Sequence, residues 1–363
     1  MPHGYTLPLF ERFPGAATLP LAGIAQLPTP VEEFAGHAVE RVGELAIKRD
    51  DLTSAAYGGN KVRKLDFLLG DALAKGAKSV LTFGAYGSNH ALATAVHARA
   101  LGLEPHVVLS PQEPGPYAPA TLLAHAGLGT VLHLTDGWDG RRAAVLAMRE
   151  IAERDGAEPY VIPMGGTNAL GALGYVDAAL ELAEQLGGDA RRTDVVYVAA
   201  GTLGTAVGLA IGFAAAGSSM RVEAIRVTPL EVASPAIAEK LAAETVALLR
   251  GLDPSFPTLA LGDLAFTLRE EWFEPGYGVV TPQTEEAVAL AASGGIKLET
   301  TYTGKAAAAM LADARDGKLE GERVLLWDTY SSAPKPPAGS VEALAPALRE
   351  YVGECVRLFG PPR

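Results

Sequence analysis

Residues 195–217 read VVYVAAGTLGTAVGLAIGFAAAG, a run of 23 residues without a charged side chain. A run of that length is long enough to cross a membrane as a helix. The turn Gly201-Thr-Leu-Gly-Thr205, however, divides it into a short half rich in valine and a longer half rich in alanine. We therefore expect a buried strand, a loop and a buried helix of an α/β protein, because buried parallel strands read as continuous apolar runs.

The same alternation of short apolar runs and alanine-rich stretches continues along the chain. It predicts strands at 79–83, 106–109, 130–134, 160–163, 195–199, 223–227 and 324–327, and helices that include 91–101, 118–126 and 141–154. Strands that alternate with helices form parallel sheets covered on both faces, so the predicted class is α/β. Segments rich in glycine and proline, at 111–119, 163–171 and 333–339, predict loops. The sequence leaves open whether a last helix, over about 340–357, packs on the outside or contacts a second subunit.

Composition and charge limit the classes of function. Of the 363 residues, 48% are hydrophobic and 20% are charged, as in a folded globular enzyme. The formal net charge of −12 argues against nucleic acid and anionic membranes as partners, because both require basic surface. Cys355 is the single cysteine, which excludes an internal disulfide and a cysteine-based metal site, and we expect no metal. The N-terminal segment lacks a basic stretch followed by an apolar one, so we expect a cytoplasmic protein.

Two lysines, Lys61 and Lys64, stand at the predicted start of a helix that runs towards Gly76. Asn60 is suited to cap this helix, and apolar residues follow at helical spacing from Leu65 to Ala72. The N-terminus of a helix carries partial positive charge, so it disfavours an ammonium group and favours an anion such as phosphate. A lysine buried there tends towards its neutral, nucleophilic form. Taken alone, an exposed pair of lysines remains the simpler explanation.

Two turns between a strand and a helix carry small polar groups. The strand at 79–83 runs into Gly84-Ala-Tyr-Gly-Ser-Asn-His90, and open α/β sheets bind ligands at such carboxyl ends. Ser88 is equally suited to cap the next helix, and a single histidine such as His90 is more often packed than catalytic. The turn at 201–205 offers backbone N–H groups and threonine hydroxyls to a phosphate, although it matches neither the dinucleotide fingerprint nor the Walker pattern. A phosphate site together with an activated lysine indicates pyridoxal phosphate.

Five motifs occur in one order along the chain: Gly58-Gly-Asn-Lys-Val-Arg-Lys-Leu65, Gly87-Ser-Asn-His90, Gly165-Gly-Thr-Asn-Ala-Leu-Gly-Ala-Leu-Gly-Tyr175, Gly276-Tyr-Gly278 and Tyr302-Thr-Gly-Lys305. Together they resemble the family of D-cysteine desulfhydrase and 1-aminocyclopropane-1-carboxylate deaminase, which belongs to the fold type II, tryptophan synthase β-like pyridoxal phosphate enzymes. The resemblance covers about residues 45–335. It implies two open, twisted, mostly parallel sheets covered by helices. It also implies a larger cofactor-binding domain of residues 1–65 and 165–363, a smaller inserted α/β domain of residues 66–164, the cofactor in the cleft between them, and a homodimer.

The resemblance further implies a role for each matched residue. Lys61 is the implied Schiff-base lysine, and Lys64 helps to hold the phosphate. The other implied cofactor-binding residues are Asn89 beside the ring or its 3′-oxygen, Thr202, Leu203, Gly204 and Thr205 around the phosphate, and Thr329 at the pyridine nitrogen. The implied substrate-binding residues are Ser88, Asn89, His90, Tyr277 and Tyr302. Of these, Ser88, Tyr277 and Tyr302 join Lys61 as catalytic residues.

The chain departs from the family pattern at four places. Leu203 stands in the phosphate loop, where the family usually has smaller residues, although its backbone N–H can still donate. Leu298-Glu-Thr-Thr-Tyr302 replaces Leu-Asp-Pro-Val-Tyr, and Asp328-Thr-Tyr-Ser-Ser332 replaces a segment with His-Thr-Gly-Gly, so Tyr330 adds bulk where the family has glycine. Thr303 stands where the deaminase type has a glutamate. A hydroxyl beside the pyridine nitrogen leaves the ring mostly neutral, which suits elimination of a good leaving group better than opening of a cyclopropane ring.

The predicted reaction is therefore α,β-elimination from a small amino acid, namely D-cysteine to pyruvate, ammonia and sulfide. Deamination of 1-aminocyclopropane-1-carboxylate and elimination from another β-substituted amino acid, such as L-cysteate, remain alternatives. A protein of a different class, an α/β protein that binds a phosphate ligand without covalent chemistry, would explain the turn at 201–205 but not Lys61.

Overall fold

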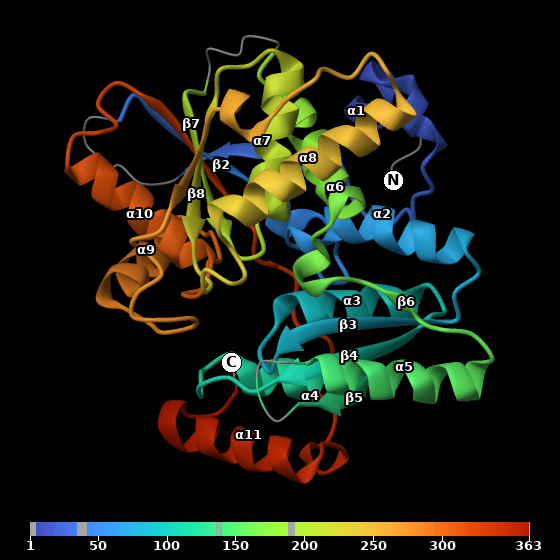
Figure 1. The fold of residues 1–363 in the computed structure, drawn as a ribbon. Coiled ribbons are helices and arrows are strands. Elements are labelled where there is room, and N and C mark those ends of the chain that lie inside the picture. The colour runs from blue at the N-terminus through green and yellow to red at the C-terminus, as the bar shows by residue number, and fades with distance from the viewer. Residues whose placement is uncertain (1–4, 35–41, 136, 138–139, 188–192, 363) are drawn as a thin grey trace.

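The computed structural model describes residues 5–34, 42–135, 137, 140–187 and 193–362. Its strands form two sheets, one above the other in Figure 1. The larger sheet has the order β1-β2-β10-β7-β8-β9, and its pairs are parallel except for β1 with β2. The smaller sheet has the order β5-β4-β3-β6 and its pairs are parallel. The predicted α/β class with two mostly parallel sheets is confirmed.

The strands are β1 (Val31–Glu33), β2 (Glu44–Lys48), β3 (Ser79–Ala85), β4 (Glu104–Ser110), β5 (Val131–Leu134), β6 (Tyr160–Val161), β7 (Val195–Ala200), β8 (Arg221–Arg226), β9 (Phe266–Arg269) and β10 (Arg323–Trp327). The helices are α1 (Pro8–Arg12), α2 (Lys61–Ala74), α3 (Asn89–Ala100), α4 (Ala118–Leu128), α5 (Arg141–Asp155), α6 (Ala169–Gln185), α7 (Gly204–Ala216), α8 (Pro235–Leu252), α9 (Pro282–Ser293), α10 (Thr303–Arg315) and α11 (Pro346–Phe359).

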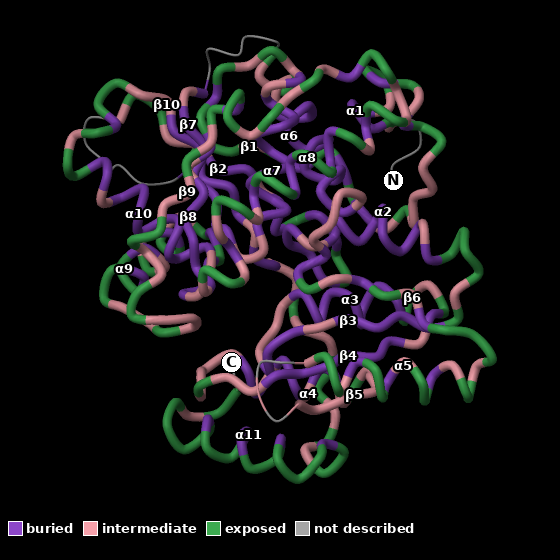
Figure 2. Tube along the Cα trace, in the orientation of Figure 1, coloured by how far each residue is buried: buried purple, intermediate pink, exposed green. Residues whose placement is uncertain are grey.

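The two faces of β7 explain why its sequence is apolar throughout. Val196 and Val198 belong to the core formed with α6, α7 and α8. Val195 and Tyr197 belong to the core on the other face, with α9 and α10. Successive side chains of a strand point to opposite faces, so a strand covered on both sides buries them all, as the buried trace through this sheet shows in Figure 2. The predicted strand, turn and helix of residues 195–217 are confirmed, and no helix in the described part of the chain is long and apolar enough to span a bilayer.

The last helix, α11, packs beside the smaller sheet, where Figure 1 shows it in red. Leu348, Val352 and Cys355 recur at helical spacing and lie in one core with Leu122 of α4 and Leu109 of β4. The sequence assigned this helix to the larger domain as part of 165–363. The structure shows its apolar stripe buried against α4. The division into domains remains a prediction.

Helix α2 connects the two sheets. Val62 and Phe67 lie in the core of the larger sheet, whereas Leu65, Leu68 and Leu69 lie in the core formed with α3 and β3. A helix that is apolar on two sides packs between two layers. The start of α2 is therefore held where the two sheets meet.

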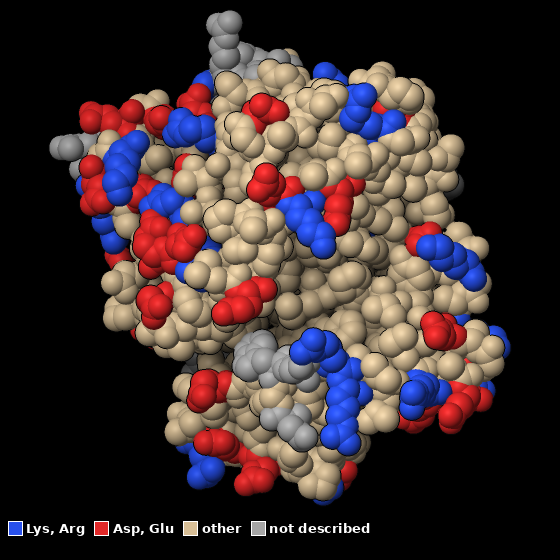
Figure 3. Space-filling view, in the orientation of Figure 1, with Lys and Arg blue, Asp and Glu red and all other residues tan. Residues whose placement is uncertain are grey.

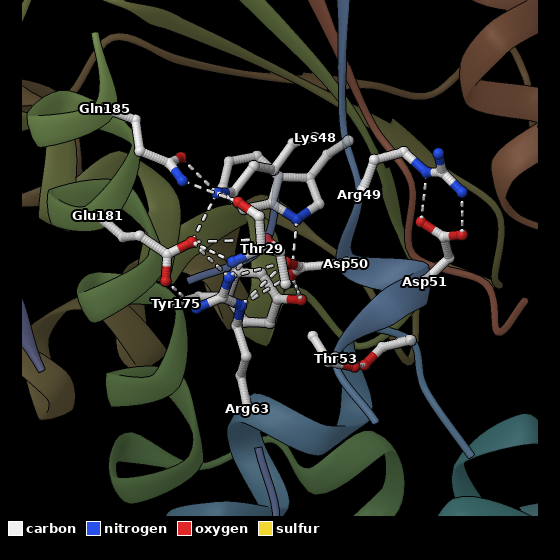
Figure 4. Close-up of polar contacts among 12 residues, drawn as sticks. Thr29, Lys48, Arg49, Asp50, Asp51, Thr53, Arg63, Tyr175, Glu181 and Gln185 are labelled. Carbon is white, nitrogen blue, oxygen red and sulfur yellow. Dashed lines mark hydrogen bonds and ion pairs between the residues drawn. The ribbon is translucent and has the colours of Figure 1, made fainter. Parts of the chain in front are cut away.

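A buried ionic network fixes the start of α2 against the larger sheet (Figure 4). Arg63 is paired with Asp50 at 2.8 Å and with Glu181 of α6 at 2.9 Å, and Lys48 of β2 is paired with the same Glu181. All four side chains are buried, and two positive charges balance two negative ones. Burial raises the pKa of Glu181, but Arg63 and Lys48 outweigh that effect and lower it to about 2.

Uncharged donors complete this ionic network. Asp50 accepts hydrogen bonds from the Tyr175 hydroxyl at 2.7 Å and from the Trp327 indole N–H at 2.8 Å. The Thr29 hydroxyl donates to the other oxygen of Asp50 at 2.9 Å. Buried charges are tolerated when they are paired and their remaining hydrogen-bonding capacity is used. The network thus connects β2, α2, α6 and β10 at one point.

The surface carries charges of both signs. On the face drawn in Figure 3, lysine and arginine side chains are interspersed with aspartate and glutamate. With a formal net charge of −12, this distribution gives no support for a polyanion as partner.

Removing the charge of Asp50 should destabilise the protein strongly. We expect Asp50→Asn to lower the free energy of unfolding by about 3–5 kcal/mol, because it leaves Arg63 buried with an incomplete set of partners. Arg221→Ala is the matched control, since it breaks a partly exposed ion pair with Glu322 and should cost about 0–1 kcal/mol. Urea unfolding followed by circular dichroism measures both. Equal losses in the two variants would contradict the central place of the network.

Candidate active site

The carboxyl ends of parallel strands from both sheets meet at one pocket. Gly84 at the end of β3 lines it, as do Gly201, Thr228 and Thr329, which follow β7, β8 and β10. The pocket has a volume of about 80 Å³. Open α/β sheets bind their ligands at such strand ends, because loops and helix N-termini gather there.

Lys61 begins α2 and lines this pocket. Its Nζ donates to Oδ1 of Asn60 at 2.9 Å, and Nδ2 of Asn60 donates to the Thr205 hydroxyl at 3.0 Å. The prediction that Asn60 caps α2 is therefore wrong, because its side chain is turned towards Lys61 and Thr205. Burial lowers the pKa of Lys61 to about 8, although the charge of Glu299 opposes this. A lysine with that pKa is partly neutral near neutral pH and hence nucleophilic.

A smaller cavity of about 10 Å³ adjoins Lys61 at the start of α7. Its lining includes Lys64, Thr202, Leu203 and Thr205. Helix α7 has no side-chain cap, so its first turn offers backbone N–H groups to an anion. Leu203 has a φ of 68°, a left-handed conformation that is uncommon for leucine and shapes the turn before the helix.

Lys64 is fixed beside this cavity. Its Nζ donates to the carbonyl of Gly165 at 3.2 Å and to the hydroxyl of Thr167 at 3.3 Å. The hydroxyls of Thr167 and Thr202 are 2.6 Å apart. Burial lowers the pKa of Lys64 well below its usual value, and the positive charge of Lys61 lowers it further. An anion bound here would favour the charged form of this amine.

The two cavities fit pyridoxal phosphate. A Cβ added to Gly165 would lie 2.1 Å from the Thr202 hydroxyl, and one added to Gly204 would lie 2.8 Å from Nζ of Lys64. Both glycines therefore keep the space beside the uncapped helix open. The phosphate requires such a site, and the aldehyde requires an amine such as that of Lys61 within the same pocket.

The segment Ser88-Asn-His90 forms the side of the pocket that belongs to the smaller sheet. The Ser88 hydroxyl accepts a hydrogen bond from the N–H of Ala91, so it caps α3 while lining the pocket. Oδ1 of Asn89 accepts from the Tyr57 hydroxyl at 3.0 Å. Nε2 of His90 lies 2.8 Å from the Thr82 hydroxyl, and burial lowers the pKa of His90 well below its usual value. His90 is thus a neutral imidazole at the edge of the pocket.

Two tyrosines form the opposite side. The hydroxyls of Tyr277 and Tyr302 are 2.9 Å apart. Burial raises the pKa of both residues, so both remain protonated. Lys305 of α10 donates to the carbonyls of Phe273 and Gly276, at 2.8 and 3.1 Å, and so anchors the loop that carries Tyr277.

The segment after β10 completes the pocket. Thr329 and Tyr330 line it, and the backbone carbonyl of Thr329 accepts from the N–H of Asn60 at 3.1 Å. Asp328 is buried, and its Oδ1 accepts from the N–H of Tyr330 at 3.1 Å. The departure at 328–332 therefore places a tyrosine ring, rather than a glycine, in the wall of the pocket.

The structure thus gathers the predicted residues in one place. Lys61, Ser88, Asn89, His90, Thr202, Tyr277, Tyr302 and Thr329 line the pocket; Lys64, Leu203 and Thr205 line the adjoining cavity; and Gly204 borders Lys64. Thr303 does not line either cavity, because its hydroxyl is bonded to Glu299.

Sequence reasoning assigned no role in the pocket to Glu299, Asn60 or Thr167. Glu299 is buried and lines the pocket. Glu299 could have been found from its position in the altered motif before Tyr302. Thr167 could have been found from its position in the motif that begins at Gly165. Asn60 was interpreted as a helix cap, so its hydrogen bond with Lys61 was not predicted.

A larger cavity of about 300 Å³ adjoins the pocket. The two share Asn89, Tyr277, Glu299, Tyr302 and Tyr330. Residues 112–118 and Phe359 of α11 are among the residues that line it but not the pocket. The larger cavity therefore extends from the two tyrosines towards α4 and α11.

Comparison with known proteins gives a consistent answer. Residues 24–329 match the family model described as pyridoxal-phosphate dependent enzyme. The chain is 37% identical over 314 residues to D-cysteine desulfhydrase of Klebsiella pneumoniae (strain 342), a match that covers 85% of this chain and 92% of the relative.

Solved structures agree with this match. The crystal structure of an ACC deaminase homologue superimposes with a TM-score of 0.75 at 32% identity, over 91% of this chain and 96% of that one. The processed form of threonine deaminase isoform 2 from Solanum lycopersicum gives a TM-score of 0.60 at 18% identity, over 98% and 90% of the two chains, and shows a shared fold. The chain therefore belongs to the family of pyridoxal-phosphate dependent enzymes and has the type II fold.

Proposed function

We propose that this enzyme is a lyase that eliminates the β-substituent of a small amino acid, and that its substrate is D-cysteine, which yields pyruvate, ammonia and sulfide. The observation that carries the proposal is that Lys61, Ser88 and the Tyr277–Tyr302 pair line one pocket. Elimination needs a base for the α-proton and a proton donor for the leaving group. The amine of Lys61 can serve as the base, and the hydroxyl groups of Ser88 and Tyr302 can serve as proton donors.

Each residue has a separate task in this proposal. Lys61 binds the cofactor and, once the substrate amine has replaced it, accepts the α-proton at Nζ. The hydroxyl of Tyr302 or of Ser88 gives a proton to the departing sulfur. Bound pyridoxal phosphate supplies the electron sink that stabilises negative charge at the α-carbon. The first turn of α7, together with Lys64, Thr202 and Thr205, holds the phosphate.

The protein environment supports this division. The lowered pKa of Lys61, about 8, allows the amine to accept a proton near neutral pH. Thr329 is the proposed partner of the pyridine nitrogen, and Asn89 that of the ring or its 3′-oxygen. Ser88, Asn89 and His90 stand on the side of the pocket proposed for the substrate carboxylate. A water molecule then hydrolyses the three-carbon product to pyruvate and ammonia, which balances the reaction.

The relative that is 37% identical supports D-cysteine, since it is itself a D-cysteine desulfhydrase. The neighbour that is an ACC deaminase homologue supports a second candidate, ring-opening deamination of 1-aminocyclopropane-1-carboxylate. The altered segments at 298–302 and 328–332 border the pocket, so elimination from another β-substituted amino acid such as L-cysteate is a third. The resemblance to the family also supports the proposal of a homodimer. The formal net charge of −12 supports the absence of a nucleic acid or anionic membrane partner, and we further propose a cytoplasmic location.

Assay of the purified enzyme with several amino acids tests the proposed reaction. We expect D-cysteine to give pyruvate and sulfide in equal amounts, with a higher kcat/KM than L-cysteate, D-serine or 1-aminocyclopropane-1-carboxylate. Lys61→Ala should lower kcat about 100-fold or more, because it removes the base. Lys75→Ala, at the exposed end of the same helix, is the matched control and should keep the wild-type rate. Turnover of the cyclopropane amino acid in preference to D-cysteine would refute the substrate but not the role of Lys61.

The pH dependence of cofactor capture tests the pKa of Lys61. A lysine attacks the aldehyde as the neutral amine, so the capture rate should rise with pH and level off above the pKa. We expect a midpoint near 8 when the apoprotein is mixed with pyridoxal phosphate and its visible absorbance band is followed. A midpoint near the ordinary lysine value of about 10.4 would show that the amine is not perturbed.

A further inference from the structure

Glu299 occupies a position that the proposed reaction leaves without a role. It lies just before α10, is 3% exposed, and lines both the pocket and the larger adjoining cavity. Its carboxylate accepts hydrogen bonds from three successive backbone N–H groups: those of Thr301 at 2.8 Å, Tyr302 at 2.7 Å and Thr303 at 2.9 Å. An ionised carboxylate is purely an acceptor, and each of these partners is a donor.

These hydrogen bonds fix the backbone of Tyr302. Tyr302 is the N-cap residue that directly precedes α10, and its own side chain does not cap the helix. Glu299, which precedes the helix, therefore caps it with its side chain, and the helix dipole favours a negative charge at this N-terminus. The Tyr302 hydroxyl is in turn bonded to that of Tyr277, whose loop is anchored by Lys305 of the same helix. One carboxylate thus holds the helix end that positions both tyrosines.

The carboxylate also faces the charged and titratable groups of the pocket. Its charge acts on Lys61 of α2 and Lys305 of α10, and on Tyr57, Tyr277, Tyr302, Tyr330 and Lys335 around them. The amine of Lys61 in turn acts on Lys64 of α2 and His90 of α3. Among these groups, Glu299 is the negative charge that acts on Lys61, and it raises the pKa that burial lowers. Without Glu299, the pKa of Lys61 would fall further, and a larger fraction of the amine would be neutral at a given pH.

We propose that Glu299 is a positioning residue of this active site: its carboxylate orients Tyr302 at the start of α10 and places a negative charge in the pocket that Lys61 lines. The proposal rests on the roles proposed above for Lys61 and Tyr302. It gives the acidic residue of the motif at 298–302 a task, because its carboxylate accepts from three successive N–H groups at the start of α10.

A simple helix cap is the competing explanation, and three variants separate it from the proposal. Glu299→Gln keeps the size of the side chain and removes the charge. Glu299→Asp keeps the charge but withdraws it by one methylene group from the N–H groups. Ser234→Ala removes the cap of α8, where the Ser234 hydroxyl accepts from Ile237, and serves as the control for loss of a cap elsewhere.

The measurements are the pH midpoint of pyridoxal phosphate capture by the full-length apoprotein, the thermal midpoint, and kcat with KM for D-cysteine. We expect Glu299→Gln to move the capture midpoint about one pH unit below that of the wild type, because an opposite charge is lost beside Lys61. Glu299→Asp should keep the wild-type midpoint but lose about tenfold in kcat with less effect on KM, since Tyr302 is displaced. Ser234→Ala should change the thermal midpoint alone.

A folded Glu299→Gln protein with an unchanged capture midpoint would overturn the electrostatic part. Wild-type kcat in Glu299→Asp would overturn the positioning part, and it remains decisive if Glu299→Gln does not fold. The capture midpoint does not depend on which substrate the enzyme uses, so a wrong substrate and a wrong role for Glu299 give different results.

Discussion

The buried ion pair between Arg63 and Asp50 determines where the reacting lysine stands. Arg63 lies two residues after Lys61 in the first turn of α2, and its guanidinium is held by Asp50 and by Glu181 of α6. Tyr175 and Trp327 complete the partners of Asp50, so α6 and β10 take part as well. Because a charge in the core is costly to leave unpaired, the helix has little freedom to shift or rotate. Lys61 is thereby fixed in the pocket at the carboxyl ends of the strands.

The two lysines of this helix differ through their surroundings and not through their chemistry. Lys61 faces the pocket, beside Asn60 and opposite Glu299. Lys64, one turn later, faces the carbonyl of Gly165 and the start of α7. Burial lowers the pKa of both amines, and the uncapped start of α7 lies beside Lys64. The proposed function therefore assigns Lys61 to the aldehyde of the cofactor and Lys64 to its phosphate.

The sequence predicted most strands of the two sheets because they read as continuous apolar runs. β3, β4, β7, β8 and β10 lie within about two residues of their predicted ranges. It did not predict β2, whose Lys48 is buried only because Glu181, 133 residues away, pairs with it. Nor did it predict that α11 packs beside the smaller sheet. The apolar stripe of an amphipathic helix shows which face is buried, but not which element covers it.

The candidate site was predictable to the extent that its residues belong to recognisable motifs. Four separate segments of the chain supply Lys61, Ser88, Tyr277 and Tyr302. The resemblance predicted that these residues share one site, and in the structure they line one pocket. Residues whose role depends on a tertiary contact were missed. Asn60 was expected to cap a helix, whereas it bonds Lys61 and Thr205. Glu299 was noticed as a departure, but its hydrogen bonds to the start of α10 follow from the fold alone.

The central claim is that Lys61, and not Lys64, carries the cofactor. Reduction of the holoenzyme with sodium borohydride fixes pyridoxal phosphate to its lysine, and peptide fragmentation by mass spectrometry then identifies that residue. The account predicts the added mass on Lys61 and an unmodified Lys64. Attachment at Lys64, or at any lysine outside the pocket, would contradict it.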